Sequence, residues 1–248
     1  MGYPECYFAR ETCNMKLTSS TVINENACAA DIVKEHYRTA SVFRKYAIEY
    51  CCGARWPLKM VLETQQLNTE QVLAELEAAC RQVTIPASVP YDTWSMDFLT
   101  EYIINIHHAY LRKSLPVIKD QVTRFVEEHR KKYPYLSEVE RKVSFLDKTM
   151  IPHLLQEEEV IFPYIRQISH AYESKESYAS LLVRTLRKPV EDLMHDEHNS
   201  IGKTLTQLRE LTNNYTAPEN ACTSHRLAYS LIKELDDDLV QHIYLEND

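Results

Sequence analysis

The sequence contains the pattern His-x-x-x-Glu twice, at His153–Glu157 and at His242–Glu246. On an α-helix this spacing places the imidazole and the carboxylate on one face, one turn apart. Each pair also continues a stripe of apolar residues at helical spacing, and a carboxylate on such a stripe is costly to bury without a partner. Two such pairs in one chain indicate a shared partner, and a metal centre is the simplest one. The stripes are Leu146, Met150, His153, Glu157, Ile161 and Ile165, and Leu231, Leu235, Leu239, His242 and Glu246.

Two further apolar stripes each carry one histidine. They are Ile104, His108, Leu111 and Leu115, and Met194, His198, Ile201, Leu205 and Leu208. The four histidines on the stripes, at positions 108, 153, 198 and 242, follow one another at intervals of 45, 45 and 44 residues. In an up-and-down bundle each interval corresponds to half a helix, a loop and half of the next helix. We therefore expect all four imidazoles at one level of a bundle core.

The predicted ligand set is His108, His153, Glu157, His198, His242 and Glu246. Six protein donors exceed what one tetrahedral zinc ion needs. The two carboxylates can each bridge two metal ions, which leaves two imidazoles as terminal ligands on each ion. The set therefore predicts a dinuclear site, and its mixed imidazole and carboxylate donors suit iron, although manganese or zinc could occupy the same donors.

Other titratable residues near these stripes are not expected to be ligands. His107 and His195 fall at the edges of their stripes, which indicates groups beside the site or on the surface. Glu158 and Glu159 follow Glu157 and should point away from the core. The remaining histidines, His36, His129, His170 and His225, receive no predicted role.

The composition favours an all-α fold. The chain of 248 residues contains only 3 glycines, and 44% of its residues are hydrophobic, which argues against a turn-rich β fold. A net charge of −8 argues against nucleic-acid binding. No run approaches the roughly 18 apolar residues of a membrane span, and residues 1–26 lack the pattern of a secretory signal. The 7 cysteines are scattered and odd in number, which indicates free thiols and a reducing cytoplasm rather than a disulfide framework.

Composition and periodicity divide the chain into four parts. We expect a loose leader at 1–26, a small helical domain at 27–83, a linker at 84–94 around Pro86 and Pro90, and an antiparallel four-helix bundle at 95–248. The bundle helices are predicted near 95–131, 137–170, 189–213 and from 218 onwards. Those of the small domain are predicted near 29–38, 40–50, from 57 and near 69–80, with a stop at Gly53.

Three local signals refine the predicted bundle helices. Ser137 and Glu140 have the spacing of a capping box. Pro189 suits the first turn of a helix. Pro116 should kink its helix or mark a restart.

The segments around the predicted ligands and one N-terminal segment resemble a known protein family. The segments Ile-His-His-Ala-Tyr-Leu-Arg-Lys-Ser-Leu-Pro (106–116), His-Leu-Leu-Gln-Glu-Glu-Glu-Val-Ile-Phe-Pro (153–163), Asp-Glu-His (196–198) and His-Ile-Tyr-Leu-Glu-Asn (242–247) resemble the hemerythrin-like domain of the RIC (repair of iron centres) family. Residues 40–53, which end in Cys51-Cys52-Gly53, resemble the small N-terminal domain of that family. The resemblance covers about residues 28–248. The sequence departs from the family pattern after Glu246, because the family's Leu-Phe-Pro continuation is not present and the last ligand is expected in a fraying turn.

The resemblance implies a cytoplasmic, stress-induced homodimer that restores iron–sulfur clusters damaged by nitric oxide or peroxide. It implies two iron ions per chain in an oxo- and carboxylate-bridged centre, with the four histidines as terminal ligands and Glu157 and Glu246 as bridges. Cys51 and Cys52 match the family's dicysteine and could act in iron transfer or thiol redox exchange. Two alternatives use the same ligands: a redox enzyme that reduces nitric oxide, and a non-enzymatic sensor that binds oxygen or nitric oxide.

Overall fold

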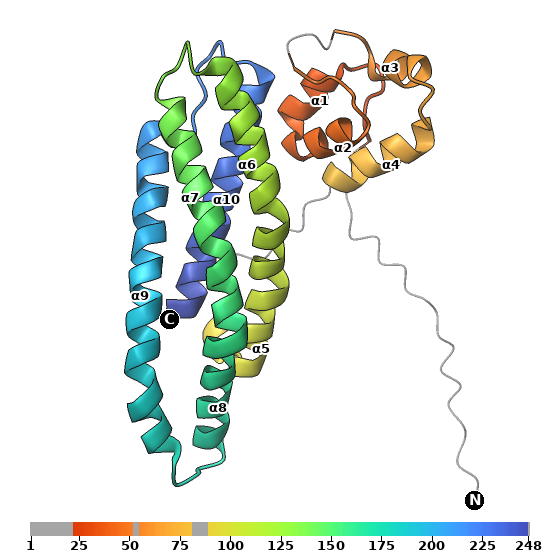
Figure 1. The fold of residues 1–248 in the computed structure, drawn as a ribbon. Coiled ribbons are helices and arrows are strands. Elements are labelled where there is room, and N and C mark those ends of the chain that lie inside the picture. Colours follow the sequence, from red (N-terminus) through yellow and green to blue (C-terminus); the bar gives the residue numbers. More distant parts are fainter. Residues whose placement is uncertain (1–21, 52–54, 81–88, 248) are drawn as a thin grey trace, which may run out of the picture.

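The prediction of an all-α fold is confirmed. The computed structural model describes residues 22–51, 55–80 and 89–247, with the backbone alone for 186–193. Within these residues every regular element is a helix, and the single isolated β-bridge joins Cys28 to Pro57. Figure 1 shows a small group of N-terminal helices lying against one side of a long helical bundle.

The helices predicted near 29–38 and 40–50 are shorter than their sequence pattern predicts, and the helix predicted near 69–80 is confirmed. The N-terminal helices are α1 (Ala29–Glu35), η1 (Tyr37–Thr39), α2 (Ala40–Lys45), α3 (Leu58–Thr64) and α4 (Thr69–Cys80). The predicted helix near 40–50 ends at Lys45, because Ala47 adopts a left-handed conformation with φ of 53° that turns the chain. The predicted stop at Gly53 lies outside the described residues.

Four antiparallel helical columns form the bundle (Figure 1). A short helix η2 (Tyr91–Thr93) precedes it. The columns are α5 (Met96–Tyr102), η3 (Ile103–His108) and α6 (Ala109–His129); α7 (Leu136–Gln156), η4 (Glu157–Ile161) and α8 (Phe162–Glu173); α9 (Ala179–Leu211); and α10 (Thr223–Asn247). The first column continues past Pro116, which lies inside α6, so the helix does not restart there.

One predicted helix start and one predicted helix cap are wrong. Helix α9 begins at Ala179, so Pro189 lies in its interior rather than in its first turn. The reason is that the ten residues from Ala179 to Lys188 are rich in Leu, Arg, Ala and Lys, which favour helix strongly enough to extend it upstream. Helix α7 begins at Leu136 without a side-chain cap, which places Ser137 inside the helix and rules out the predicted capping box. The Val139 N–H, which a Ser137 cap could have served, donates to the Tyr135 carbonyl instead.

The small domain and the bundle each have a core, and they share a contact surface. Side chains such as Leu115, Phe125, Leu146 and Leu239 fill the bundle core. The N-terminal core is built around Phe43, Leu58, Leu62 and Leu76, and it includes Leu227 from the start of α10. Polar contacts join the two parts as well: Arg38 lies 2.9 Å from Glu234 of α10, and Arg44 lies 3.2 Å from Asp120 of α6.

The buried carboxylate of Asp236 in α10 stabilises the turn between α9 and α10. The residue is 3% exposed, accepts two hydrogen bonds of 2.6 Å from Arg209, and accepts one of 2.8 Å from Tyr215. We expect Asp236→Ala to lower the free energy of unfolding by about 2 kcal/mol, because Arg209, whose side chain is 40% exposed, and the Tyr215 hydroxyl both lose their acceptor. Urea denaturation measures this change. Asp237→Ala, at the exposed neighbouring position, should change stability by less than about 0.5 kcal/mol, and equal losses in both variants would contradict this role for Asp236.

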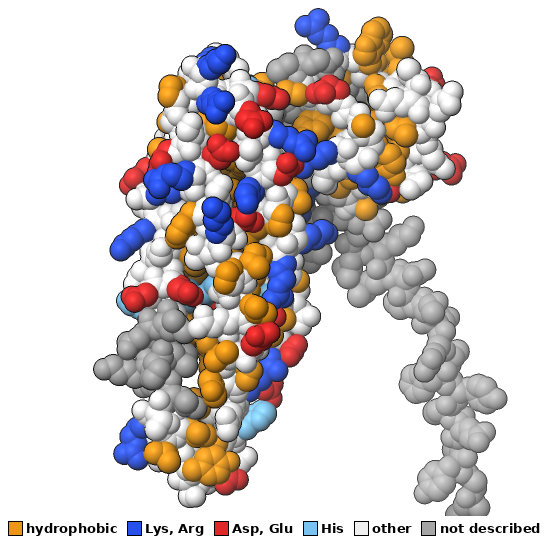
Figure 2. Space-filling model, in the orientation of Figure 1, with side chains coloured by type: hydrophobic (Ala, Val, Ile, Leu, Met, Phe, Trp, Pro, Cys, Tyr) orange, Lys and Arg blue, Asp and Glu red, His pale blue; other side chains and the backbone are white. Residues whose placement is uncertain are grey.

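The surface carries both signs of charge. On the face of the bundle seen in Figure 2, the Lys and Arg side chains lie interspersed with Asp and Glu side chains. No helix in the described part of the chain combines the length and the apolar character that a membrane crossing would require.

Candidate metal centre

The six predicted ligands come from four different columns and meet in the bundle core. His108 ends η3, His153 lies in the last turn of α7, and Glu157 begins η4. His198 lies in α9, and His242 and Glu246 lie one turn apart near the end of α10. All four imidazoles and the Glu157 side chain are buried. The Glu246 side chain is also 0% exposed, although the backbone around it is open, and α10 stays helical through Asn247.

The donors form two groups that share both carboxylates. One group contains His108, His242, Glu157 and Glu246, and the other contains His153, His198, Glu157 and Glu246. In each group one ligand atom per residue lies within 4.8 Å of all the others. Each carboxylate therefore offers donors to both groups, as expected of two bridging carboxylates between two neighbouring metal ions.

The individual oxygens of the bridges face different groups. Glu157 Oε2 lies 3.4 Å from His108 Nε2, and its Oε1 lies 3.1 Å from His153 Nε2. Glu246 Oε1 lies 2.6 Å from His242 Nε2, and its Oε2 lies 3.3 Å from His198 Nε2. Each carboxylate thus turns one oxygen to each pair of imidazoles.

The donor atoms themselves indicate that cations belong here. Six of them are buried and make no well-aligned hydrogen bond among the described residues, although imidazole nitrogens lie close to several of them. They are His153 Nε2, His198 Nε2, and both oxygens of Glu157 and of Glu246. The Nε2 atoms of His108 and His242 face each other at 3.1 Å. Because buried polar atoms are rarely left unsatisfied, this set fits a pair of metal ions.

Without metal, the centre holds protons. Burial opposes the charge on His108 and His198, but the surrounding carboxylates outweigh it and raise the pKa of His108 to about 9 and that of His198 to about 10. The pKa of His153 is raised for the same reason. Burial likewise disfavours the charge on Glu157, yet His108, His153 and His198 lower its pKa to about 2, and nearby imidazoles hold the pKa of Glu246 well below its usual value.

Three of the imidazoles are oriented by a side chain at their outer nitrogen. Glu158 lies 2.7 Å from His108 Nδ1, Glu197 lies 2.6 Å from His153 Nδ1, and Asn247 lies 3.1 Å from His198 Nδ1. Such contacts fix the ring so that Nε2 faces the metal. The expectation that Glu158 points away from the core is therefore wrong: it bridges His108 and Arg112. Glu159 is exposed, as expected.

The other histidines lie outside the ligand set. His107 is buried beside it, stacks on His242 and pairs with Asp238 at 2.9 Å. His195 and His170 are exposed. His225 is buried among Phe125, Tyr133 and Tyr229, and burial lowers its pKa to about 4, so it is neutral at pH 7.

The predicted dicysteine is remote from the metal ligands. Cys51 contacts Ser224 at the start of α10, with 3.5 Å between Sγ and Oγ. Cys52 lies outside the described residues.

Two ligands lie at irregular helical turns that the sequence pattern did not reveal. The η3 and η4 segments are π-helical, and His108 and Glu157 lie within them. In η4 the Phe162 N–H donates to the Glu157 carbonyl, five residues back. Pro163 follows directly and cannot donate to the turn before it. Such turns are often found at functional sites because they reorient one or two side chains within a helix.

Glu158 offers a test of the orienting contacts. We expect Glu158→Ala to weaken metal binding about 10- to 100-fold, since His108 loses the carboxylate that directs Nε2 inward. Glu159→Ala is the matched control because the same residue type is removed from the same π-helical segment at an exposed position. Competition against a metal-sensitive chelator measures both. Equal affinities in the two variants would show that Glu158 does not support the site.

The fold and the ligands define a helical bundle that binds metal through imidazoles and shared carboxylates, and the chain matches known proteins of that class. The family model described as "Hemerythrin HHE cation binding domain" matches residues 100–248, and a second, ScdA_N, described as a domain of unknown function, matches residues 25–80. The chain is 30% identical to the iron-sulfur cluster repair protein YtfE of Citrobacter koseri and to that of Escherichia coli O157:H7, and 29% identical to that of Enterobacter sp. strain 638. Each match covers 85% of this chain and 88% of the relative.

The chain belongs to the RIC family, with the small N-terminal domain of that family followed by a hemerythrin-like domain. The hemerythrin-like domain is the part of the chain that binds iron.

Proposed function

We propose that this protein repairs iron–sulfur clusters damaged by nitrosative or oxidative stress, by delivering iron from a centre of two iron ions. The observation that carries the proposal is the pair of ligand groups that share Glu157 and Glu246. The similarity to proteins named for iron–sulfur cluster repair supports the same reaction. The ions would be bridged by the two carboxylates and by an oxo group, with His108 and His242 on one ion and His153 and His198 on the other.

The ligands suit an ion that must leave again. Each group supplies four protein donors, fewer than the six that iron takes in octahedral coordination, so an acceptor could approach an open position. The imidazoles favour the protonated form when no metal is bound, so protonation competes with ligation. Release of iron would therefore leave a centre in which imidazolium and carboxylate groups neutralise one another.

In this proposal the dicysteine lies far from the metal ligands. Ser224, which contacts Cys51, is 18 residues before His242 on the same helix, about 27 Å along its axis. Iron therefore cannot pass directly from the centre to Cys51 in this arrangement. Transfer by Cys51 and Cys52 would require either movement of the small domain or a second copy of the chain, as in the homodimer that we propose.

The proposed partners are damaged iron–sulfur proteins in the cytoplasm, with no role for nucleic acid or membrane. A reducing compartment suits the thiols of Cys28, Cys80 and Cys222, which form no disulfide. Open coordination positions would also suit a second candidate function, the reduction of nitric oxide at the same centre. Turnover of nitric oxide with an electron donor would favour that reaction over iron delivery, and reversible oxygen or nitric oxide binding without turnover would favour a sensor.

Reactivation of a damaged enzyme tests the proposed repair. The iron-loaded protein is mixed anaerobically with an iron–sulfur dehydratase inactivated by nitric oxide, with a chelator present to remove free ferrous iron. We expect recovery of most of the activity with the wild-type protein and little with Glu157→Ala, which should hold less than one iron per chain. The Glu159→Ala variant should match the wild type. Equal recovery with Glu157→Ala would overturn the proposal.

The same assay isolates the dicysteine. If Cys51 and Cys52 carry iron, their double substitution by alanine should leave the iron content unchanged and abolish recovery. Full recovery in the double variant would exclude the dicysteine from the reaction while leaving the role of the metal centre intact.

A further inference from the structure

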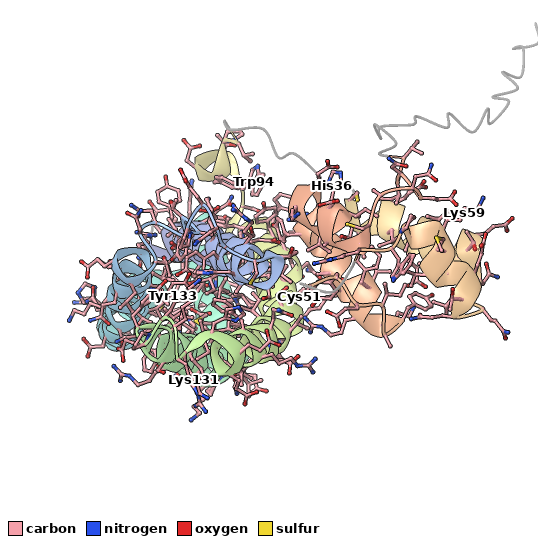
Figure 3. All side chains as sticks on the ribbon, turned by 90° about the horizontal axis from the view of Figure 1, so that it is seen from above. His36, Cys51, Lys59, Trp94, Lys131 and Tyr133 are labelled. Carbon is pink, nitrogen blue, oxygen red and sulfur yellow. The ribbon has the colours of Figure 1, made fainter. Side chains whose placement is uncertain are left out.

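A second group of reactive side chains lies at the other end of the bundle, where the small domain meets it. Cys51 of the small domain and Cys222, just before α10, both contact the hydroxyl of Ser224, at 3.5 and 3.1 Å. Because both sulfurs contact the same oxygen, the distance between them is at most the sum of the two contact distances. Both cysteines are partly exposed, whereas Ser224 is buried. Figure 3 looks down on this end of the molecule and shows Cys51 at the junction of the two parts.

A histidine is oriented toward one of these thiols. His129, at the end of α6, has its Nε2 3.3 Å from Cys222 Sγ and its Nδ1 2.9 Å from the carbonyl oxygen of Phe125. The carbonyl can only accept, so Nδ1 carries the proton and donates it, and Nε2 presents a lone pair to the Cys222 thiol. A thiol paired with an imidazole that a third group orients is the arrangement that activates cysteine nucleophiles.

The hydrogen bonds of this group can all run in one direction. The Cys51 S–H donates to Ser224 Oγ, the Ser224 hydroxyl can donate to Cys222 Sγ, and the Cys222 S–H can donate to His129 Nε2. His129 donates in turn to the Phe125 carbonyl. Protons from both thiols can therefore be passed toward one base without any group having to reverse its role.

We propose that Cys51 and Cys222 are a redox pair that forms a reversible disulfide between the small domain and the bundle when the protein meets a peroxide. His129 takes the proton of Cys222, and the thiolate attacks one peroxide oxygen. The S–O bond forms as the O–O bond breaks, and the leaving oxygen departs as water with the proton from His129. The Cys51 sulfur then attacks the sulfenic acid, the S–S bond forms, the S–O bond breaks, and the second oxygen leaves as water with the proton that Cys51 gives up. Two thiols lose two electrons in all, and one peroxide is reduced to two waters.

Formation of the bond requires the two sulfurs to close the gap that Ser224 now bridges. A disulfide needs sulfurs about 2.05 Å apart, so the Ser224 hydroxyl must move out from between them. The cross-link would connect residues 171 positions apart in the sequence and would remove Cys51 from any reaction with iron. The same bond would therefore form in response to the oxidant and prevent Cys51 from reacting as part of the dicysteine. The proposal does not depend on the repair function.

Peptide mapping of the whole chain tests the proposal. The iron-loaded protein is treated with hydrogen peroxide for increasing times, quenched with catalase and an alkylating reagent, and digested with trypsin without reduction. We expect one linked product that joins the tryptic peptides 46–55 and 210–226 and disappears on reduction. The Glu157→Ala variant, expected to hold less than one iron per chain, should form the same product, which separates thiol chemistry from oxidation catalysed by released iron.

Variants identify the atoms involved. Cys51→Ser and Cys222→Ser should each abolish the linked product, whereas Cys28→Ser, Cys80→Ser and Cys52→Ser should retain it. His129→Gln should slow its formation at least about tenfold at pH 7 without changing its identity. The proposal is overturned if Cys222 stays fully alkylatable while Cys51 is oxidised, if the link persists in Cys51→Ser, or if Cys52→Ser abolishes it. An unchanged rate in His129→Gln would remove the histidine from the mechanism.

Discussion

Replacement of Glu157 by alanine is expected to reduce the iron content from the proposed two atoms per chain to below one. The residue serves both ligand groups, with one oxygen facing His108 and the other facing His153. Its loss therefore weakens both metal positions at once, whereas loss of a terminal histidine weakens one. Metal analysis of the purified protein, together with the visible absorption of the proposed oxo-bridged di-iron centre, measures the effect.

Two comparisons distinguish loss of the ligand from loss of the fold. Glu157→Gln keeps the size of the side chain but offers only one oxygen, so we expect it to lose iron as well. Glu159→Ala should keep the full iron content. The metal-free forms of both Glu157 variants should remain helical by circular dichroism, because removal of a buried carboxylate spares its desolvation. A full complement of iron in Glu157→Ala would show that Glu246 alone bridges the two ions.

Iron binding is expected to tighten about 100-fold for each pH unit between pH 6.5 and 8. The pKa values of about 9 for His108 and about 10 for His198 mean that both imidazoles are protonated in the metal-free centre throughout this range. Both must lose a proton to bind iron, so binding releases at least two protons and raising the pH favours the loaded form. Glu157, with its pKa of about 2, is already ionised and releases none.

Anaerobic isothermal titration with ferrous iron, in two buffers of different ionisation enthalpy, counts these protons. A release of two or more protons per chain is the expected outcome at pH 7. His170→Ala should leave the count unchanged, because that imidazole is exposed and remote from the ligands. An affinity that does not vary with pH would mean that the metal-free imidazoles are neutral.

The fold was predictable to the extent that it depends on apolar periodicity. The stripes through His108, His153, His198 and His242 predicted four antiparallel columns, because one face of each helix must pack on its neighbours. Helix ends were less predictable. Ser137 offered a cap that the structure does not use, since the helix already begins at Leu136 and the Val139 N–H donates to the Tyr135 carbonyl. Pro189 was misleading because the helix-favouring residues before it extend α9 further than the proline signal indicates.

The structure brings the six predicted donors together, but the sequence could not identify the groups behind them. Glu158, Glu197 and Asn247 each adjoin a ligand in the sequence, where a helical wheel directs them away from the core. Each reaches the histidine of a different column, so its role depends on how the helices are rotated against one another. Cys222 and His129 also remained unconnected, because 93 residues separate them and only the packing of α6 against the start of α10 brings them together.

The π-helical turns at His108 and Glu157 determine what a one-residue deletion in these helices would do. Each such turn contains one residue more than an α-helical turn, so it amounts to a single-residue insertion tolerated within a helix. Deletion of one residue from η3 or η4 would restore regular α-helical winding and remove the wide turn, while the helix on either side keeps its apolar face toward the core. The residues within the turn, among them the ligand His108 or Glu157, would then point in a different direction. The two extra residues are thus part of the coordination geometry, although neither needs to touch the metal.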